Sequence, residues 1–124
     1  MTVPILKQGD ILIASIQAAL SDRDLVQLQD DFAHQVGHLR SRGVVIDVTA
    51  LDVLDSFATR TLRSIAYTAK LRGAHAVVVG IQPDVAFAMV QLGLSLEGVT
   101  TALDLEEGLA EIARIVRRGT HRGL

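Results

Sequence analysis

The stretch that decides the fold runs from Gly43 to Leu71 and reads GVVIDVTALDVLDSFATRTLRSIAYTAKL. Residues 43–48 are β-branched and almost continuously apolar, which is typical of a parallel strand covered on both faces. A polar turn follows, and residues of an inward face then recur at steps of three and four, which predicts an amphipathic helix. These residues are Phe57, Thr61, Leu62, Ile65, Ala66 and Ala69. The stretch therefore predicts a buried strand, a short acidic loop and a helix that begins at Ser56.

The segment before this stretch predicts a hairpin and a helix. Two short β-prone runs, 3–7 and 11–17, are separated by Gln8-Gly9-Asp10, a glycine-containing turn signal. We expect Asp22 to cap the next helix, which ends near residues 42–43. Its apolar face is made of Leu25, Leu28, Phe32, Val36 and Leu39.

The segment after this stretch continues the alternation of strands and helices. The central helix should stop at Arg72-Gly73, and residues 76–81 predict a second buried strand. Pro83 suits the first turn of a shorter helix, residues 98–102 predict a brief strand, and Asp104 can cap a final helix. The expected inward residues of these two helices are Val85, Met89 and Leu92, then Leu105, Leu109, Ile112 and Val116.

The order of these elements, ββαβαβαβα, predicts a single α/β domain. Strands that alternate with helices imply right-handed crossovers and a mostly parallel open sheet with helices packed against it. The N-terminal hairpin is expected at one side of the sheet. We expect the domain to occupy residues 1–117 and residues 118–124 to form a flexible basic tail.

The composition excludes several classes of function. With 49% hydrophobic but only 3% aromatic residues, the core must be aliphatic and no base-stacking platform is available. A net charge of −2 provides no field that attracts nucleic acid or anionic lipid. Cysteine is absent, which excludes disulfides and thiol nucleophiles. Neither a signal peptide nor a run of about 20 apolar residues is recognisable, so a soluble cytoplasmic protein is expected.

No constellation of side chains predicts an enzyme, a metal or a cofactor. No glycine-rich phosphate loop is present. Ser56 follows a strand, as the serine of a nucleophile elbow does, but the glycines that flank such a serine are missing. His34 and His38 have a spacing that can bind metal, yet no third ligand accompanies them. Two solvated histidines explain that pair more simply.

The junction at Ser56 has two interpretations. The start of a helix offers unpaired N–H groups and partial positive charge, which suit a phosphate. A phosphate on Ser56 would add a charge of about −1.5 to −2, which Arg60 could pair with and Asp55 would repel. The simpler interpretation is that Asp55 or Ser56 is only the N-cap. Arg60 and Arg63 are also candidates for docking a protein partner near this junction.

Two short blocks at this junction, residues 44–49 (VVIDVT) and 53–56 (VLDS), resemble the signature of the STAS domain of anti-sigma-factor antagonists. In that family a hydrophobic strand ends in Asp and Ser/Thr, and Asp-Ser opens a helix after a loop. Many members continue with Asp-Ser-Ser-Gly or Asp-Ser-Ala-Gly, whereas this chain has Asp55-Ser56-Phe57-Ala58. The chain is more similar to the RsbS-type stressosome scaffold proteins, which also match residues 11–17, 80–83 and 101–109.

This resemblance implies a partner set and a mechanism. Proteins of this type co-assemble with RsbR-type STAS proteins into a large core that holds an RsbT-type serine/threonine kinase. Under stress the kinase phosphorylates the STAS serine, here Ser56, and leaves; an RsbX-type phosphatase resets the site. Thr59 is a secondary candidate for phosphorylation, and a homo-oligomer within the larger core is expected. The implied switch-loop and partner-binding residues are Asp47, Asp52, Asp55, Phe57, Arg60 and Arg63.

Two other functions stay open at this point. A simple anti-sigma-factor antagonist would bind an anti-sigma kinase directly, be inactivated by phosphorylation of Ser56, and form only small complexes. A small-molecule-binding or hydrolytic domain would use Ser56 to bind or hydrolyse a small molecule. It would be stabilised thermally by its ligand or labelled at Ser56 by a serine-directed probe.

Overall fold

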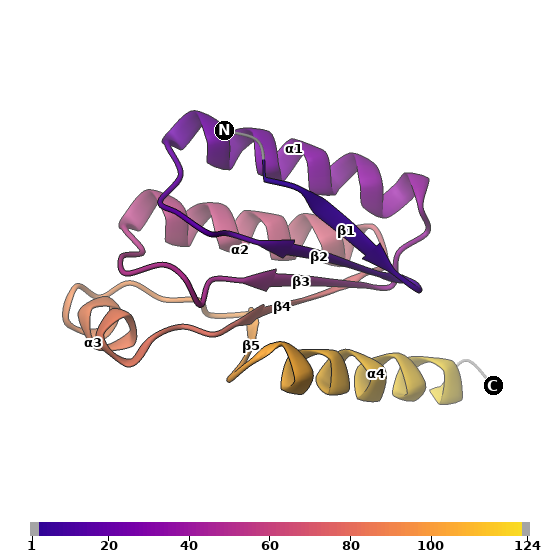
Figure 1. The fold of residues 1–124 in the computed structure, drawn as a ribbon. Helices are drawn as coiled ribbons and strands as arrows, with labels where there is room; N and C mark the ends of the chain where they lie inside the picture. Colours follow the sequence, from indigo (N-terminus) through magenta and orange to yellow (C-terminus); the bar gives the residue numbers. More distant parts are fainter. Residues whose placement is uncertain (1–2, 123–124) are drawn as a thin grey trace.

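The computed structural model describes residues 3–122, which form one sheet flanked by helices in the predicted order (Figure 1). Strand boundaries differ from the predicted ones by one or two residues. The elements are β1 (Ile5–Gln8), β2 (Ile11–Ser15), α1 (Asp22–His38), β3 (Gly43–Asp47), α2 (Ser56–Leu71), β4 (His75–Val79), α3 (Pro83–Gln91), β5 (Thr100–Ala102) and α4 (Leu105–Arg122).

The sheet is mostly parallel and places its strands in chain order, β1-β2-β3-β4-β5. The β1–β2 hairpin is antiparallel, with Gln8 paired to Ile11 around a turn in which Gly9 has a φ of 61°. All other neighbours are parallel, so the carboxyl ends of β2 to β5 meet at one edge. The predicted α/β fold with a hairpin at one side is confirmed. The loops that follow these strands, including the one that leads to Ser56, gather at this carboxyl edge.

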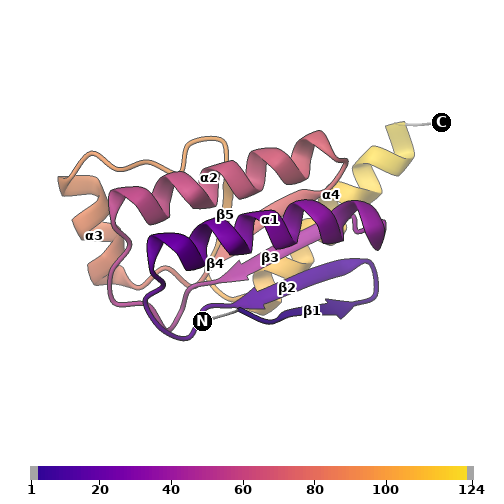
Figure 2. The same ribbon diagram turned by 90° about the horizontal axis from the view of Figure 1, so that it is seen from above.

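Two cores explain why β3 is apolar along its whole length. Figures 1 and 2 show α1 and α2 side by side on one face of the sheet and α4 on the other. Val44 and Ile46 belong to the larger core under α1 and α2, whereas Val45 belongs to the core under α4. All three side chains are fully buried. Alternate residues of one strand therefore fill different cores, as expected for a central parallel strand.

Helix α1 begins and ends differently from the prediction. Ser21, not Asp22, is the N-cap: its hydroxyl accepts from the Asp24 N–H (3.1 Å), and its own N–H donates to the Asp24 carboxylate (3.2 Å). The helix ends at His38, several residues before the predicted stop, because Arg40 adopts a left-handed φ of 51°. The Ser41 N–H then donates to the Val36 carbonyl at 3.0 Å and closes the end.

Helix α3 lies beyond the carboxyl edge and confirms most of its prediction. Pro83 occupies its first turn, and Val85 and Met89 are buried. Leu92 was predicted to point inward but is 72% exposed. The helix ends at Gln91 and the chain turns at Gly93 (φ 70°), so the helical spacing no longer applies at Leu92. Leu94 packs against the core in its place.

Helix α4 is capped as predicted and extends beyond the predicted domain boundary. The Asp104 carboxylate accepts from the Glu107 N–H at 2.8 Å, and Ile112 is buried against the sheet. The backbone of α4 continues through Arg122, while residues 123–124 of the expected tail lie outside the described residues. The flexibility of that tail stays a prediction. Within residues 3–122, no helix is long and apolar enough to cross a membrane.

Candidate switch site

The start of α2 assigns the capping role to Asp55. This residue has extended backbone angles, and its carboxylate accepts a hydrogen bond from the Ala58 N–H at 2.8 Å. Ser56 is therefore the first helical residue and not the cap. Of the two capping candidates that the sequence offered, the structure selects Asp55.

Ser56 is exposed, and its hydroxyl has no hydrogen-bond partner among the described residues. Within residues 3–122, the backbone N–H groups of Ser56 and Phe57 likewise find no acceptor, as is usual in a first helical turn. The Asp55 carboxylate accepts from the Ala58 N–H, and the Asp55 carbonyl accepts from the Thr59 N–H. An accessible hydroxyl thus lies beside two unused donors at the positive end of a helix.

The two threonines that follow are placed differently. Thr59 is 2% exposed and its hydroxyl donates to the Asp55 carbonyl at 2.8 Å. Thr61 is 6% exposed and donates to the Phe57 carbonyl at 2.9 Å. Hydroxyls bonded in this way to the preceding turn are withdrawn from solvent. In this folded state, only Ser56 of the three offers its hydroxyl to another protein.

Residues 48–55, here named the switch loop, are held in place by apolar anchors. Val48, Leu51 and Leu54 are buried, and the Val48 N–H donates to the Val79 carbonyl at 3.0 Å. Between these anchors, Asp52 is exposed and Val53 is 67% exposed. The loop is therefore anchored to the core and presents the Asp52 carboxylate and the Val53 side chain outward.

Asp47 anchors the beginning of the switch loop and does not face Ser56 as a free carboxylate. Its Oδ1 accepts from the N–H (2.9 Å) and the hydroxyl (2.5 Å) of Thr49. The Gln82 side-chain amide donates to the Thr49 carbonyl at 2.7 Å, which ties the switch loop to the segment before α3. Gly80, with a φ of 82°, leaves room for Thr49. These roles of Thr49, Gly80 and Gln82 are not predicted from the sequence, although a glycine directly after a buried strand is a recognisable signal.

The two arginines on α2 are both exposed but differ in their contacts. Arg63 donates to the Ser95 carbonyl at 3.2 Å and is thereby tied to the segment after α3. Arg60, one turn after Ser56, has no ion-pair or hydrogen-bond partner among the described residues. Together with Gln29 and Tyr67 they line a shallow groove along α2. Arg60 is the cation that remains available near Ser56.

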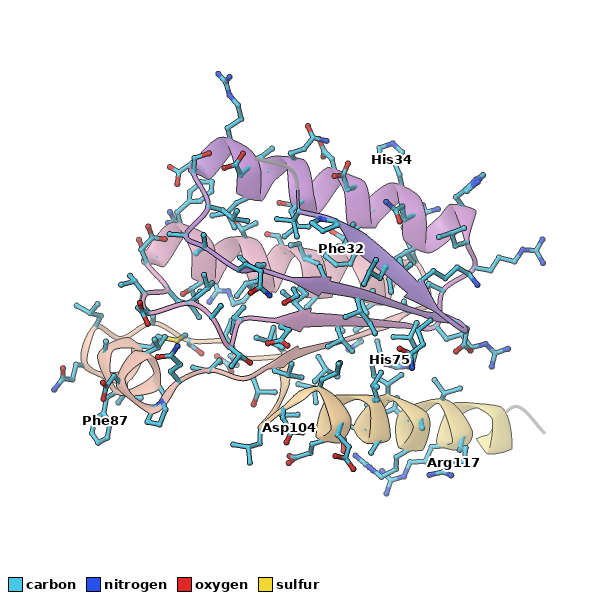
Figure 3. All side chains as sticks on the ribbon, viewed as in Figure 1. Phe32, His34, His75, Phe87, Asp104 and Arg117 are labelled. Atoms are coloured by element: carbon cyan, nitrogen blue, oxygen red, sulfur yellow. The ribbon has the colours of Figure 1, made fainter. Side chains whose placement is uncertain are left out.

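The histidine pair on α1 does not form part of this site. His34 points away from the sheet into solvent, whereas Phe32 on the same helix points inward (Figure 3). The His34 Nδ1 lies 2.8 Å from the Asp30 carbonyl of its own helix, and His38 is exposed. Among the described residues, no group of three His, Cys, Asp or Glu side chains is arranged to hold a metal ion.

Two solved structures are similar to this chain over nearly its whole length. One is Moorella thermoacetica RsbS with a serine-to-glutamate substitution, which is 37% identical, with a TM-score of 0.79, covering 93% of this chain and 97% of that chain. The other is a chain from the molecular architecture of the stressosome, described as a signal integration and transduction hub. It is also 37% identical, with a TM-score of 0.75, covering 92% of this chain and 99% of that chain.

A characterised relative and a family model agree with these structures. The RsbT co-antagonist protein RsbRA of Bacillus subtilis is 25% identical over 100 residues, which cover 81% of this chain. The chain spans only 36% of the length of that relative. The model of the STAS domain matches residues 2–108. Together with the observed fold, this match shows that the chain belongs to the STAS domain family.

Proposed function

We propose that this chain is a non-enzymatic stressosome scaffold protein of the RsbS type. It co-assembles with RsbR-type STAS proteins in the cytoplasm and holds an RsbT-type serine/threonine kinase until Ser56 is phosphorylated. The observation that carries this proposal is the 37% identity to RsbS over 93% of this chain and 97% of that one. The similarity to RsbRA, named an RsbT co-antagonist, supports the same partner set.

The geometry of Ser56 supports its role as the acceptor. The kinase transfers the γ-phosphoryl group of ATP to the Ser56 hydroxyl oxygen, which releases ADP and the hydroxyl proton. The hydroxyl is exposed and has no hydrogen bond to lose among the described residues. The N–H groups of Ser56 and Phe57 and the guanidinium of Arg60 can then receive phosphate oxygens. An RsbX-type phosphatase resets the site.

Charge at the surface around Ser56 explains the release of the kinase. A phosphate brings a charge of about −1.5 to −2 to a position that already follows Asp52 and Asp55. A kinase that covers this surface must then bury the added charge or leave. Because Ser56 is exposed and Asp55 keeps its cap, the domain itself has no reason to refold. The switch acts on the binding surface and not on the fold.

Particle size tests the proposal against the simple antagonist. The purified chain, an RsbR-type protein and an RsbT-type kinase are mixed, and the mass of the complex is measured by light scattering after gel filtration. The scaffold predicts a large particle that contains all three proteins. A small complex of this chain with the kinase alone would favour an anti-sigma-factor antagonist and contradict the scaffold role.

A charge substitution tests the switch in the same assay. Ser56→Glu should reduce kinase retention because it places a carboxylate at the contact surface, while the particle of STAS proteins persists. Ala113→Glu is the matched control, since Ala113 is also exposed but lies on α4, on the opposite face of the sheet (Figure 1). Equal retention by wild type and Ser56→Glu would contradict the proposed release.

A further inference from the structure

A small apolar cavity opens beside Ser56, between the N-terminal ends of α1 and α2. These ends lie together at one side of the molecule, next to the switch loop (Figure 1). The volume of the cavity is about 80 Å³. Its floor consists of buried side chains that are at most 7% exposed: Ile16, Leu25, Leu51, Leu54 and Leu62.

The rim of the cavity is continuous with the candidate switch site. Asp55, the N-cap of α2, and Ala58, in its first turn, line one side. Val53 of the switch loop and Ala19 of the β2–α1 connection line the rest of the rim, and both are exposed. Ser56 therefore lies next to residues that line this cavity, and a protein docked on Ser56 can cover its mouth.

The size and chemistry of the cavity limit what it can hold. Ligand pockets for metabolites typically enclose about 300 to 1,000 Å³ and contain several orienting polar groups. Among the described residues that line this cavity, only Asp55 is polar, and its Oδ1 already accepts from the Ala58 N–H. An apolar cavity of about 150 Å³ admits benzene, so one of roughly half that volume suits a single branched aliphatic group.

We propose that this cavity is the docking pocket for one aliphatic side chain, such as Leu, Ile or Val, of the kinase that acts on Ser56. The inference rests on the proposed function, because that function brings a kinase to this surface. A few anchor side chains that fill desolvated pockets, surrounded by contacts that exclude water, carry most of the binding energy of many protein interfaces, and such an anchor can be aliphatic. A phosphate on Ser56 would stand at the edge of this pocket, so it would bring charge and water to the contact that holds the kinase.

Filling the pocket tests the proposal. Ala58→Leu extends a side chain from the rim into the cavity and leaves Ser56, Asp55 and the backbone cap in place. We expect kinase affinity, measured by calorimetry with the full chain, to fall about tenfold or more. Ala113→Leu is the matched control, because Ala113 is an exposed helical alanine of α4 on the opposite face of the sheet. Its affinity for the kinase should equal that of wild type.

A variant at the rim keeps the test informative if Ala58→Leu does not fold. Val53→Ser removes an exposed apolar side chain and should weaken kinase binding several-fold. Leu71→Ser, which removes a similarly exposed apolar side chain at the other end of α2, should not. Xenon serves as an independent probe of the empty cavity. It should shift the methyl NMR signals of Leu25, Leu54 and Leu62 in wild type, and not in Ala58→Leu or in the kinase complex.

The outcomes separate this inference from the proposed function. If wild type does not bind the kinase, both are wrong. If wild type binds and folded Ala58→Leu and Val53→Ser bind equally well, only the pocket is wrong. Xenon shifts that persist in the kinase complex would also show that no side chain fills the cavity.

Discussion

At the residue scale, the neighbours Asp55 and Ser56 divide two roles that their residue types could share. The Asp55 carboxylate binds the Ala58 N–H and fixes the start of α2. The Ser56 hydroxyl has no partner among the described residues and faces outward. A residue that stabilises the fold and a residue available for modification thus stand side by side. The phosphate can be added without removing the cap.

Because Asp55 caps the helix and Ser56 does not, alanine substitutions at the two positions should affect stability differently. Asp55→Ala should lower the free energy of unfolding by about 0.5 to 2 kcal/mol, because the Ala58 N–H loses its acceptor. Ser56→Ala, which removes no hydrogen bond, should stay within about 0.5 kcal/mol of wild type. Urea denaturation of both variants gives the comparison. A larger loss for Ser56→Ala would mean that Ser56 is the working cap.

The sequence predicts that α2 begins at Asp55 and Ser56, but not which of these two side chains caps the helix. Aspartate and serine are both preferred at N-caps. The pair Asp-Ser therefore marks the start of the helix but does not indicate which residue is the N-cap. The choice depends on the backbone angles of Asp55, which the buried anchors Leu51 and Leu54 help to set. The same limitation explains why Asp22 was expected to cap α1 when Ser21 does so.

At the element scale, two helical glycines show how closely helices approach their neighbours. A Cβ on Gly108 of α4 would lie 2.6 Å from a methyl group of Val79, a fully buried residue of β4. A Cβ on Gly37 of α1 would meet the guanidinium of Arg72, the exposed end of a flexible side chain. Only the contact at Gly108 is fixed by the packing of a helix on the sheet.

Alanine at these two glycines should therefore change stability in different directions. Gly108→Ala should lower the free energy of unfolding by about 1 to 3 kcal/mol, since overpacking forces α4 away from β4. Gly37→Ala should leave it unchanged or raise it by up to about 1 kcal/mol, because alanine favours a helix and Arg72 can move aside. Thermal and urea denaturation measure both. Equal losses would contradict the close approach of α4 to the sheet.

The link between the switch loop and the segment before α3 gives a second prediction at this scale. Gly80→Ala should destabilise the protein more than Gly93→Ala does. Both glycines have positive φ, which costs alanine about 1 to 2 kcal/mol. Only at Gly80 would the Cβ also collide with the Thr49 hydroxyl, 1.9 Å away, whereas Gly93 has open space around it. If both variants lose a similar free energy of unfolding in urea denaturation, Thr49 of the switch loop does not pack closely against Gly80.

Hydrophobic periodicity predicted the elements well and their ends less well. The continuous apolar run in β3 and the spacing of three and four in α2 reflect burial, which dominates folding. The end of α1 depends on Arg40 in a left-handed conformation that its residue type does not signal. The cavity beside Ser56 was not predicted at all, because its walls come from the β2–α1 connection, α1, the switch loop and α2, which only the fold brings together.

At the scale of the whole molecule, the switch site and the two cores are separate. The cores lie on either side of the sheet, while the switch loop, the start of α2 and α3 share its carboxyl edge (Figure 1). Exposed apolar side chains also occur at this edge, among them Val53 and Phe87, which points outward (Figure 3). A change of charge at Ser56 can therefore alter this binding surface while both cores stay packed.

The most direct test of the central claim is to incubate the chain with an RsbT-type kinase and ATP and to follow intact mass, peptide maps and bound kinase together. We expect one phosphate on Ser56, none on the Ser56→Ala variant, and loss of the kinase only from the chain that carries the phosphate. Thr59 should stay unmodified because its hydroxyl is buried. No phosphate on wild type, equal phosphate on Ser56→Ala, or retention of the kinase by the phosphorylated chain would contradict the switch.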